Sequence, residues 1–338
     1  MLNEYMDERL ELLKSWLRSV TGLATFDIAL ASSDASFRRY YRVSYNGENR
    51  IVMDAPPDKE DCRPYVKVAR AFASLGLNVP NIYQTDFERG FLLLSDLGKR
   101  SYLEMLNVSS VDKLYGDALD ALFVLQSYQQ YEKDYLPSYN SDLLISEMAL
   151  FHEWYLGRQL SLKLKDKQRK VLDLTYEILL ISAMEQPAVW VHRDYHSRNL
   201  MVVEENNPGI LDFQDAVVGP ATYDLVSLLR DCYIRWPRKK VHSWVEKYYL
   251  RLVENGVINH VDISQFMRWF DLMGIQRHLK AIGIFSRLNI RDGKPGYLQD
   301  IPRTLSYVKE VSEFYPELSG FNRLLHEVVP ENHAELLS

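Results

Sequence analysis

The feature that most constrains the fold of this chain is the separation of its two kinds of hydrophobic pattern. Between residues 26 and 53, short β-compatible segments flank an Asn46-Gly47 dipeptide, which predicts an antiparallel hairpin. The apolar run 91–94 predicts a buried strand. From residue 111 to 184, apolar residues instead recur at helical spacing. The sequence therefore predicts a β-rich part followed by a helical part.

These patterns predict an α+β protein with two lobes. Residues 1–97 are expected to form a small mixed β-sheet lobe that begins with an amphipathic helix. Residues 98–338 are expected to form a larger helical lobe that carries the functional site. A length of 338 residues agrees with this division, since a domain has roughly 150 residues.

Composition excludes several classes of function. The chain has 40 Lys and Arg against 46 Asp and Glu, a net charge of −6, so it lacks the basic surface of a nucleic-acid binder or a polybasic membrane anchor. It contains no apolar run of about 18 residues, the length that crosses a bilayer. Its two cysteines, Cys62 and Cys232, are too few for a disulfide framework. We therefore expect a cytoplasmic protein that binds neither nucleic acid nor membrane.

Two short apolar strands inside the helical part lead into polar clusters. The eight residues that follow the strand 189–191 read HRDYHSRN and match HRDxxxxN, a loop in which the aspartate accepts a hydroxyl proton and the asparagine binds a metal. Asp194 and Asn199 hold those two positions. The second strand, 209–211, leads into Asp212, 18 residues after Asp194.

Asp194, Asn199 and Asp212 together predict phosphoryl transfer. This reaction needs oxygen ligands for a Mg²⁺ ion on the phosphates and a base beside the acceptor hydroxyl. We expect all three to be catalytic, with Asn199 and Asp212 also binding the metal. The alternative is that they only cap turns and helices. Within the same loop, His192 is expected to position the backbone, and Arg193 to pair with a local carboxylate.

The predicted nucleotide lobe lacks two features of a kinase. The segment where a glycine-rich loop belongs, 32–39, contains no glycine, and the strand 50–54 carries no lysine. We expect Ser36 and Arg38 to contact the phosphates of ATP, with Arg39, Lys59 and Lys67 as alternatives for the cation that replaces the missing lysine. The backbone of Ser95, Asp96 and Leu97, at the end of the buried strand, is expected to bind the adenine.

The residues after Asp212 indicate a family. Phe213-Gln214-Asp215, Gly219-Pro220 and Asp224-Leu225 together resemble the aminoglycoside phosphotransferase and choline kinase superfamily, whose fold is protein-kinase-like. The resemblance implies ATP and Mg²⁺ as cofactors and a small-molecule acceptor. It also implies that Asp224 anchors a loop or caps a helix and does not take part in the chemistry.

A narrower resemblance spans nearly the whole chain. The segments 37–42, 53–57, 276–280 and 291–294 look like those of the anomeric N-acetylmuramate/N-acetylglucosamine kinases of Gram-negative cell-wall recycling. This resemblance implies ATP-dependent phosphorylation of the C1 hydroxyl of an amino sugar, a step in peptidoglycan recycling. It further implies that the sugar 1-phosphate passes to a uridylyltransferase, with which we expect no stable complex.

Glu147, Asp215 and Arg277 are the residues from which we expect sugar contacts. Arg277 shares a predicted helical face with Lys280 and Arg287, and a cation there would bind the lactyl carboxylate of N-acetylmuramate. The alternative is that all of these are ordinary surface charges. Two alternative functions also remain open: a kinase for another acceptor, such as an aminoglycoside, choline or a different sugar, and a pseudokinase scaffold.

Overall fold

The structure is a computed structural model that describes residues 2–33, 37–128 and 135–329. The chain divides into two compact units. The first consists of Met1–Arg100 and Met201–Asp215, and the second of Ser101–Leu200 and Ala216–Ser338. None of the helices in the described ranges has both the length and the apolar character needed to cross a bilayer.

The first unit contains a five-stranded antiparallel sheet with the order β1-β2-β3-β5-β4. Its strands are β1 Asp27–Ser33, β2 Arg39–Tyr45, β3 Glu48–Asp54, β4 Ile82–Asp86 and β5 Phe91–Ser95. The predicted hairpin is confirmed, because β2 and β3 pair from Tyr45–Glu48 to Arg39–Asp54. Asn46 and Gly47 both have positive φ angles, as a tight hairpin turn requires. The run 91–94 is a buried strand, as predicted.

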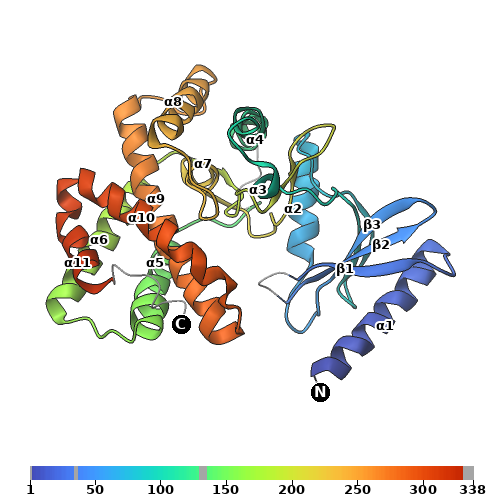
Figure 1. Cartoon of the computed structure of the whole chain (residues 1–338). Helices are drawn as coiled ribbons and strands as arrows, with labels where there is room; N and C mark the ends of the chain where they lie inside the picture. Colours follow the sequence, from blue (N-terminus) through green and yellow to red (C-terminus); the bar gives the residue numbers. More distant parts are fainter. Residues whose placement is uncertain (1, 34–36, 129–134, 330–338) are drawn as a thin grey trace. The chain divides into compact units, whose positions relative to one another are not determined.

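Two helices accompany this sheet, α1 (Leu2–Thr21) and α2 (Arg63–Ser74). The amphipathic α1 lies along the sheet (Figure 1) and packs Leu13, Trp16 and Leu17 against its apolar side chains. A buried carboxylate also ties the helix to the sheet, because Asp54 pairs with Arg9 of α1 and Arg39 of β2.

Residues 201–215 belong to the first unit, although the sequence analysis grouped them with the helical lobe. The amide of Ile210 donates a hydrogen bond of 2.7 Å to the carbonyl of Asn78. Phe213 packs against two aromatic rings of α2, with centroid distances of 4.8 Å to Tyr65 and 5.8 Å to Phe72. These contacts join residues far apart in sequence, so local patterns did not reveal them. Within this stretch, β7 (Leu200–Met201) pairs with β8 (Gly209–Ile210).

The second unit is mainly helical. Its elements, in chain order, are α3 Tyr102–Met105, α4 Val111–Ser127, α5 Ser141–Leu150, the π-helix η1 Phe151–Gln159, α6 Asp166–Met184, β6 Ala188–Val191, β9 Val217–Pro220, α7 Tyr223–Leu229, α8 Arg238–Glu254, α9 Ile263–Asp292, the 3₁₀ helix η2 Pro295–Asp300, α10 Ile301–Phe314, the 3₁₀ helix η3 Pro316–Leu318 and α11 Ser319–Val328. Strands β6 and β9 form a short antiparallel pair. The α+β prediction is therefore confirmed.

The long helix α9 is the centre of the second unit. It packs against α5, η1, α6, α7 and α10, so its middle is buried on all sides (Figure 1). Gly283 allows the closest of these contacts, because a Cβ atom there would lie 2.4 Å from the carbonyl carbon of Leu150. The sequence around residue 280 is therefore enclosed, and polar side chains in this stretch need partners.

Candidate active site

The loop that follows β6 has a backbone fixed by a buried carboxylate. Asp224, in the first turn of α7, accepts hydrogen bonds from the amides of His192 (2.6 Å) and Arg193 (3.0 Å). Burial raises the pKa of Asp224 to about 7, whereas the two amide hydrogen bonds favour its ionised form. The predicted anchoring role of Asp224 is confirmed. Arg193 has a φ of 77°, a strained conformation of the kind that clusters at functional sites.

Side chains within the loop hold Asp194 in position. The amide of Asp194 donates to Nδ1 of His192 at 3.2 Å, which confirms that His192 positions the backbone. The side-chain amide of Asn199 donates to the carbonyl of Asp194 at 3.0 Å. The hydroxyl of Tyr195 donates to the carbonyl of Ala118 in α4 at 2.8 Å, which joins the loop to the helical core.

Asp194 is held ionised by its surroundings. Burial acts to raise its pKa, but nearby positive side chains, of which Lys280 contributes most, outweigh burial and lower the pKa to about 2. A carboxylate that stays charged at neutral pH can accept a hydrogen bond from a hydroxyl group and then its proton. This is the state that the predicted role of Asp194 requires.

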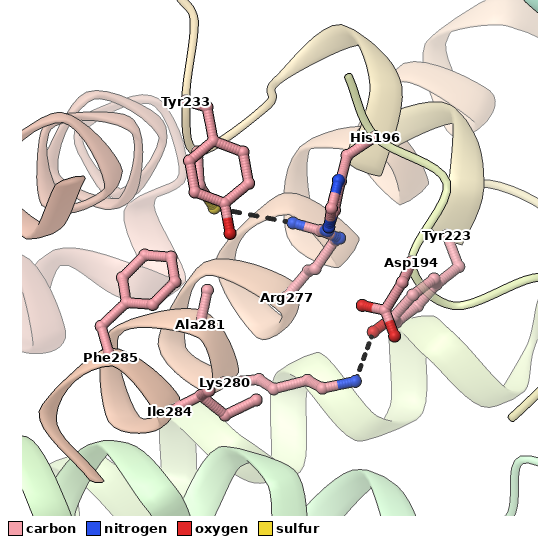
Figure 2. Close-up of a pocket in the computed structure, with 10 residues that line it drawn as sticks. Asp194, His196, Tyr223, Tyr233, Arg277, Lys280, Ala281, Ile284 and Phe285 are labelled. Atoms are coloured by element: carbon pink, nitrogen blue, oxygen red, sulfur yellow. Dashed lines mark hydrogen bonds between the residues drawn. The ribbon is translucent and has the colours of Figure 1, made fainter. Parts of the chain in front are cut away.

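Asp194 borders a cavity of about 90 Å³ within the second unit. Figure 2 shows Arg277 and Lys280 of α9 extending toward the loop that carries Asp194 and His196. The opposite part of the lining is apolar and aromatic, and includes Tyr233, Ile284 and Phe285. The cavity therefore offers one charged side and one apolar side to a ligand.

Glu147 lies behind this lining in a buried cluster of charges. Its carboxylate pairs with Lys280 at 2.9 Å and with Arg193. Lys280 also donates a hydrogen bond of 3.0 Å to the hydroxyl of Tyr223, and Tyr139 donates to Glu147. Burial acts to raise the pKa of Glu147, but Lys280 and Arg193 outweigh it and lower the pKa. Glu147 is 5% exposed and is therefore not a surface charge, and the predicted pairing of Arg193 with a local carboxylate is confirmed.

Asp212 belongs to the first unit, where it follows β8. Its φ of 61° is left-handed, a conformation that aspartate and asparagine tolerate better than most residues. Gln214 donates a hydrogen bond of 2.9 Å to the carboxylate of Asp212 and one of 3.2 Å to that of Asp215. Asp215 is exposed. The buried ring of the intervening Phe213 fixes this segment to α2.

The segment predicted to bind adenine lies at the end of β5. The backbone amide of Ser95 donates to the carbonyl of Asn81 at 2.9 Å, so this amide is already used. Asp96 forms a bidentate ion pair with Arg42, whose Nε and Nη2 atoms donate to the two carboxylate oxygens at 2.5 and 3.0 Å. Leu97 packs closely on Gly209, where a Cβ atom would lie only 3.0 Å from the leucine side chain.

Of the two residues predicted to contact phosphate, the structure describes Arg38 but not Ser36. Arg38 is 8% exposed and pairs with Glu60 at 2.8 Å. Ser36 lies outside the described residues.

A magnesium site fits the donors that the chain offers. Asn199 and Asp212 supply amide and carboxylate oxygens, the ligands that Mg²⁺ prefers. In the part of the chain that the structure describes, no group of three or more His, Cys, Asp and Glu side chains gathers to hold a metal. Mg²⁺ usually retains several waters and takes one or two carboxylates from a protein.

Three residues of the cavity lining, His196, Tyr233 and Phe285, were not predicted from the sequence. His196 carried a signal, because it lies two residues after Asp194 within the loop. Phe285 lies in an apolar stretch whose pattern is that of any buried helix, and Tyr233 lies in a short segment between helices, so no local signal distinguished them.

Comparison with known proteins shows the family to which the chain belongs. A model of the phosphotransferase enzyme family matches residues 27–272, which is more than half of the chain. The chain therefore belongs to the phosphotransferase enzyme family. Two similar proteins are named N-acetylmuramate/N-acetylglucosamine kinase. The one from Pseudomonas putida is 45% identical over 331 residues, which cover 97% of this chain and 95% of that protein. The one from Neisseria meningitidis serogroup B is 41% identical over 326 residues, which cover 96% and 97%.

Solved structures show the same fold at low sequence identity. Choline kinase LicA from Streptococcus pneumoniae has a TM-score of 0.63 and 10% identity, over 90% of this chain and 99% of that one. The ADP-bound aminoglycoside phosphotransferase APH(2'')-Ib has a TM-score of 0.56 and 15% identity, over 88% and 98%. The predicted protein-kinase-like fold is confirmed.

Proposed function

We propose that this protein is an ATP-dependent kinase that phosphorylates the C1 hydroxyl of N-acetylmuramate and N-acetylglucosamine. The observation that carries the proposal is the ionised Asp194 at the edge of a cavity with one cationic and one aromatic side. Relatives that share 41–46% of their residues with this chain are named for these two sugars. Part of an amino sugar suits such a cavity, because the sugar ring has apolar C–H faces as well as hydroxyl groups.

In this function Asp194 accepts the proton of the attacking hydroxyl. Its amide hydrogen bond to His192 and the contact from Asn199 keep the carboxylate in place. Asn199 and Asp212 hold Mg²⁺, which when bound supplies the positive charge that offsets the phosphate oxygens. Arg38 and Ser36 contact the phosphates, and the segment from Ser95 to Leu97 binds the adenine edge.

Of the three residues predicted to contact the sugar, Arg277 lines the cavity, whereas Glu147 and Asp215 do not. Arg277 lines the cavity that Asp194 borders. Glu147 holds Lys280, which lines the same cavity, so any effect of Glu147 on the sugar passes through Lys280. Asp215 is exposed, and its contact with the sugar is a prediction from sequence alone.

The product of this reaction, a sugar 1-phosphate, is the kind of substrate that a uridylyltransferase consumes. We therefore also propose that the enzyme acts in peptidoglycan recycling and forms no stable complex with the uridylyltransferase. The cytoplasm, which contains ATP, is the compartment in which such a reaction takes place.

The test is ADP release measured with a panel of acceptors. We expect turnover with N-acetylmuramate and N-acetylglucosamine, and phosphorus NMR of the product should place the phosphate on C1. Asp194→Asn should lower kcat by about a hundredfold or more, because a positioned general base contributes roughly that much. Its far-ultraviolet circular dichroism should match that of the wild type. Turnover of choline or an aminoglycoside without turnover of either sugar contradicts the proposal, and no ATP turnover at all indicates a pseudokinase.

A further inference from the structure

Arg277 is a buried cation without a carboxylate partner. The residue is 5% exposed. The hydrogen bond that its guanidinium makes runs from Nη1 to Sγ of Cys232 over 3.6 Å, and Nε has no partner. No carboxylate oxygen of the described residues forms an ion pair with it. A thiol is a weak acceptor. Burial acts to lower the pKa of Arg277, but Cys232, Tyr223, Asp194 and Asp231 outweigh it and raise the pKa, so these neighbours stabilise the charge without a direct ion pair, and Nε still lacks a partner.

Other buried cations of the same unit are compensated. Lys280 and Arg193 share the carboxylate of Glu147, and Arg230 pairs with Asp271. Buried charges are normally paired, because an isolated charge in a poorly hydrated site is costly. Arg277 departs from this rule at a place where a ligand can supply a directly paired anion, since its side chain borders the cavity (Figure 2).

The geometry of the cavity limits what this anion can be. A volume of about 90 Å³ is well below the roughly 300 Å³ of a cavity that encloses a whole ligand, so the cavity accepts one part of a ligand. Lys280 is a weaker candidate for the same role, because it already has a carboxylate partner in Glu147 at 2.9 Å. A planar guanidinium also matches a carboxylate, which it can bind through two parallel hydrogen bonds.

We propose that Arg277 binds the carboxylate of an acidic amino sugar and thereby sets the preference of the enzyme between acidic and neutral sugars. The inference rests on the proposed function. N-acetylmuramate carries a lactyl carboxylate, and N-acetylglucosamine lacks it. An alternative source of the anion is the transferred phosphate of ATP, which both reactions share, so the two sugars together distinguish the two sources.

The first test compares kcat/KM for both sugars in the wild type and in Arg277→Gln. The ratio for N-acetylmuramate over N-acetylglucosamine should fall by about tenfold or more, equal to about 1.4 kcal/mol, and mainly through KM for the acidic sugar. Arg268→Gln is the matched control. Arg268 lies on the same helix but pairs with Glu317 at the surface, so its loss should leave the ratio unchanged. Equal losses for both sugars overturn the inference and favour the phosphate of ATP.

A second test changes the sugar and uses the unaltered enzyme. The carboxamide of N-acetylmuramate removes the negative charge while keeping nearly the same size. The wild type should use it at least about tenfold less well than the acid, whereas Arg277→Gln should use the two alike. If the wild type uses acid and amide equally, the inference is wrong even if Arg277→Gln does not fold. If the wild type phosphorylates neither sugar, the proposed function itself fails.

Discussion

Glu147 compensates two buried cations at once. Lys280 and Arg193 come from different elements, α9 and the loop after β6, and both end on this one carboxylate of α5. Arg193 has a left-handed backbone that the surrounding contacts must maintain. The pairing therefore connects the conformation of the loop to the charge on the cavity wall.

Glu147→Gln should destabilise the protein strongly. The change keeps the size of the side chain but leaves two buried cations without their counter-charge, and breaking a buried pair in this way costs about 3–5 kcal/mol. Urea denaturation should show a loss of this size. Asp120→Asn is the control, because Asp120 forms an exposed ion pair with Arg251, which should contribute less than about 1 kcal/mol. A loss for Glu147→Gln no larger than that of the control contradicts the structural role of the cluster.

At the scale of an element, α9 shows what periodicity can and cannot predict. A helix with one apolar face normally exposes its polar residues to solvent. In α9, Arg277, His278 and Lys280 are all buried, because neighbouring helices enclose the middle of the helix. The spacing of Arg277 and Lys280 correctly predicted that both lie on one face. The burial of that face depends on helices distant in sequence and could not be derived from the spacing.

His278 makes the stability of the protein depend on pH. It is 1% exposed, stacks on Tyr307 at 4.9 Å, and its Nε2 lies 2.8 Å from the carbonyl of Arg230. Burial, together with the positive charges of Arg277 and Arg230, lowers the pKa of His278 to about 3, although the hydrogen bond to the carbonyl acts in the opposite direction. In the unfolded chain the pKa of histidine is about 6.5.

The direction in which the stability changes with pH follows from these two pKa values. Between about pH 6.5 and pH 3 the unfolded chain binds a proton at this site and the folded protein does not, so the folded state loses stability as the pH falls. At pH 5 the loss should be about 2 kcal/mol relative to neutral pH. His278→Gln should remove this part of the dependence in urea denaturation between pH 7 and pH 5. The exposed His260, changed to Gln, serves as the control. The same slope in wild type and His278→Gln would show that His278 is protonated in the folded protein.

Local signals predicted most of the elements that carry the site. The Asn46-Gly47 turn, the strand before Ser95 and the strand before His192 were all visible in the pattern of residues. Two kinds of feature were not. The burial of the cations on α9 depends on contacts with other helices, and residues 201–215 join the first unit through the packing of Phe213 and the hydrogen bond from Ile210. Both depend on long-range packing, to which local periodicity is insensitive.

At the scale of the whole molecule, the proposed catalytic residues are divided between the two units. Asp194 and Asn199 belong to the second unit, and Asp212 to the first. Each unit fixes its own residues by separate contacts: Asp224 anchors the loop of the second, and the packing of Phe213 fixes the segment of the first. A change at Asp212 tests whether the residue that the first unit contributes to this proposal binds the metal.

Asp212→Asn is the most informative change for this test. Alanine tolerates the φ of 61° poorly, whereas asparagine tolerates it as aspartate does, so this variant removes the charge without straining the backbone. A ligand at a hundred times its Kd stabilises the folded state by about 2.7 kcal/mol, which appears as a rise in Tm. ATP with Mg²⁺ should produce this rise in the wild type and little of it in Asp212→Asn.

Removal of the metal provides the internal comparison for Asp212→Asn. With EDTA in place of Mg²⁺, the rise in Tm caused by ATP should be small and equal in the wild type and the variant, because the carboxylate acts on the nucleotide through the ion. Glu204→Gln is the matched control, since Glu204 is an exposed acid of the same segment and its loss should leave the rise with Mg²⁺ unchanged. If Asp212→Asn keeps the full rise with Mg²⁺, then Asp212 does not bind the metal, and the magnesium site must be built from other oxygen donors.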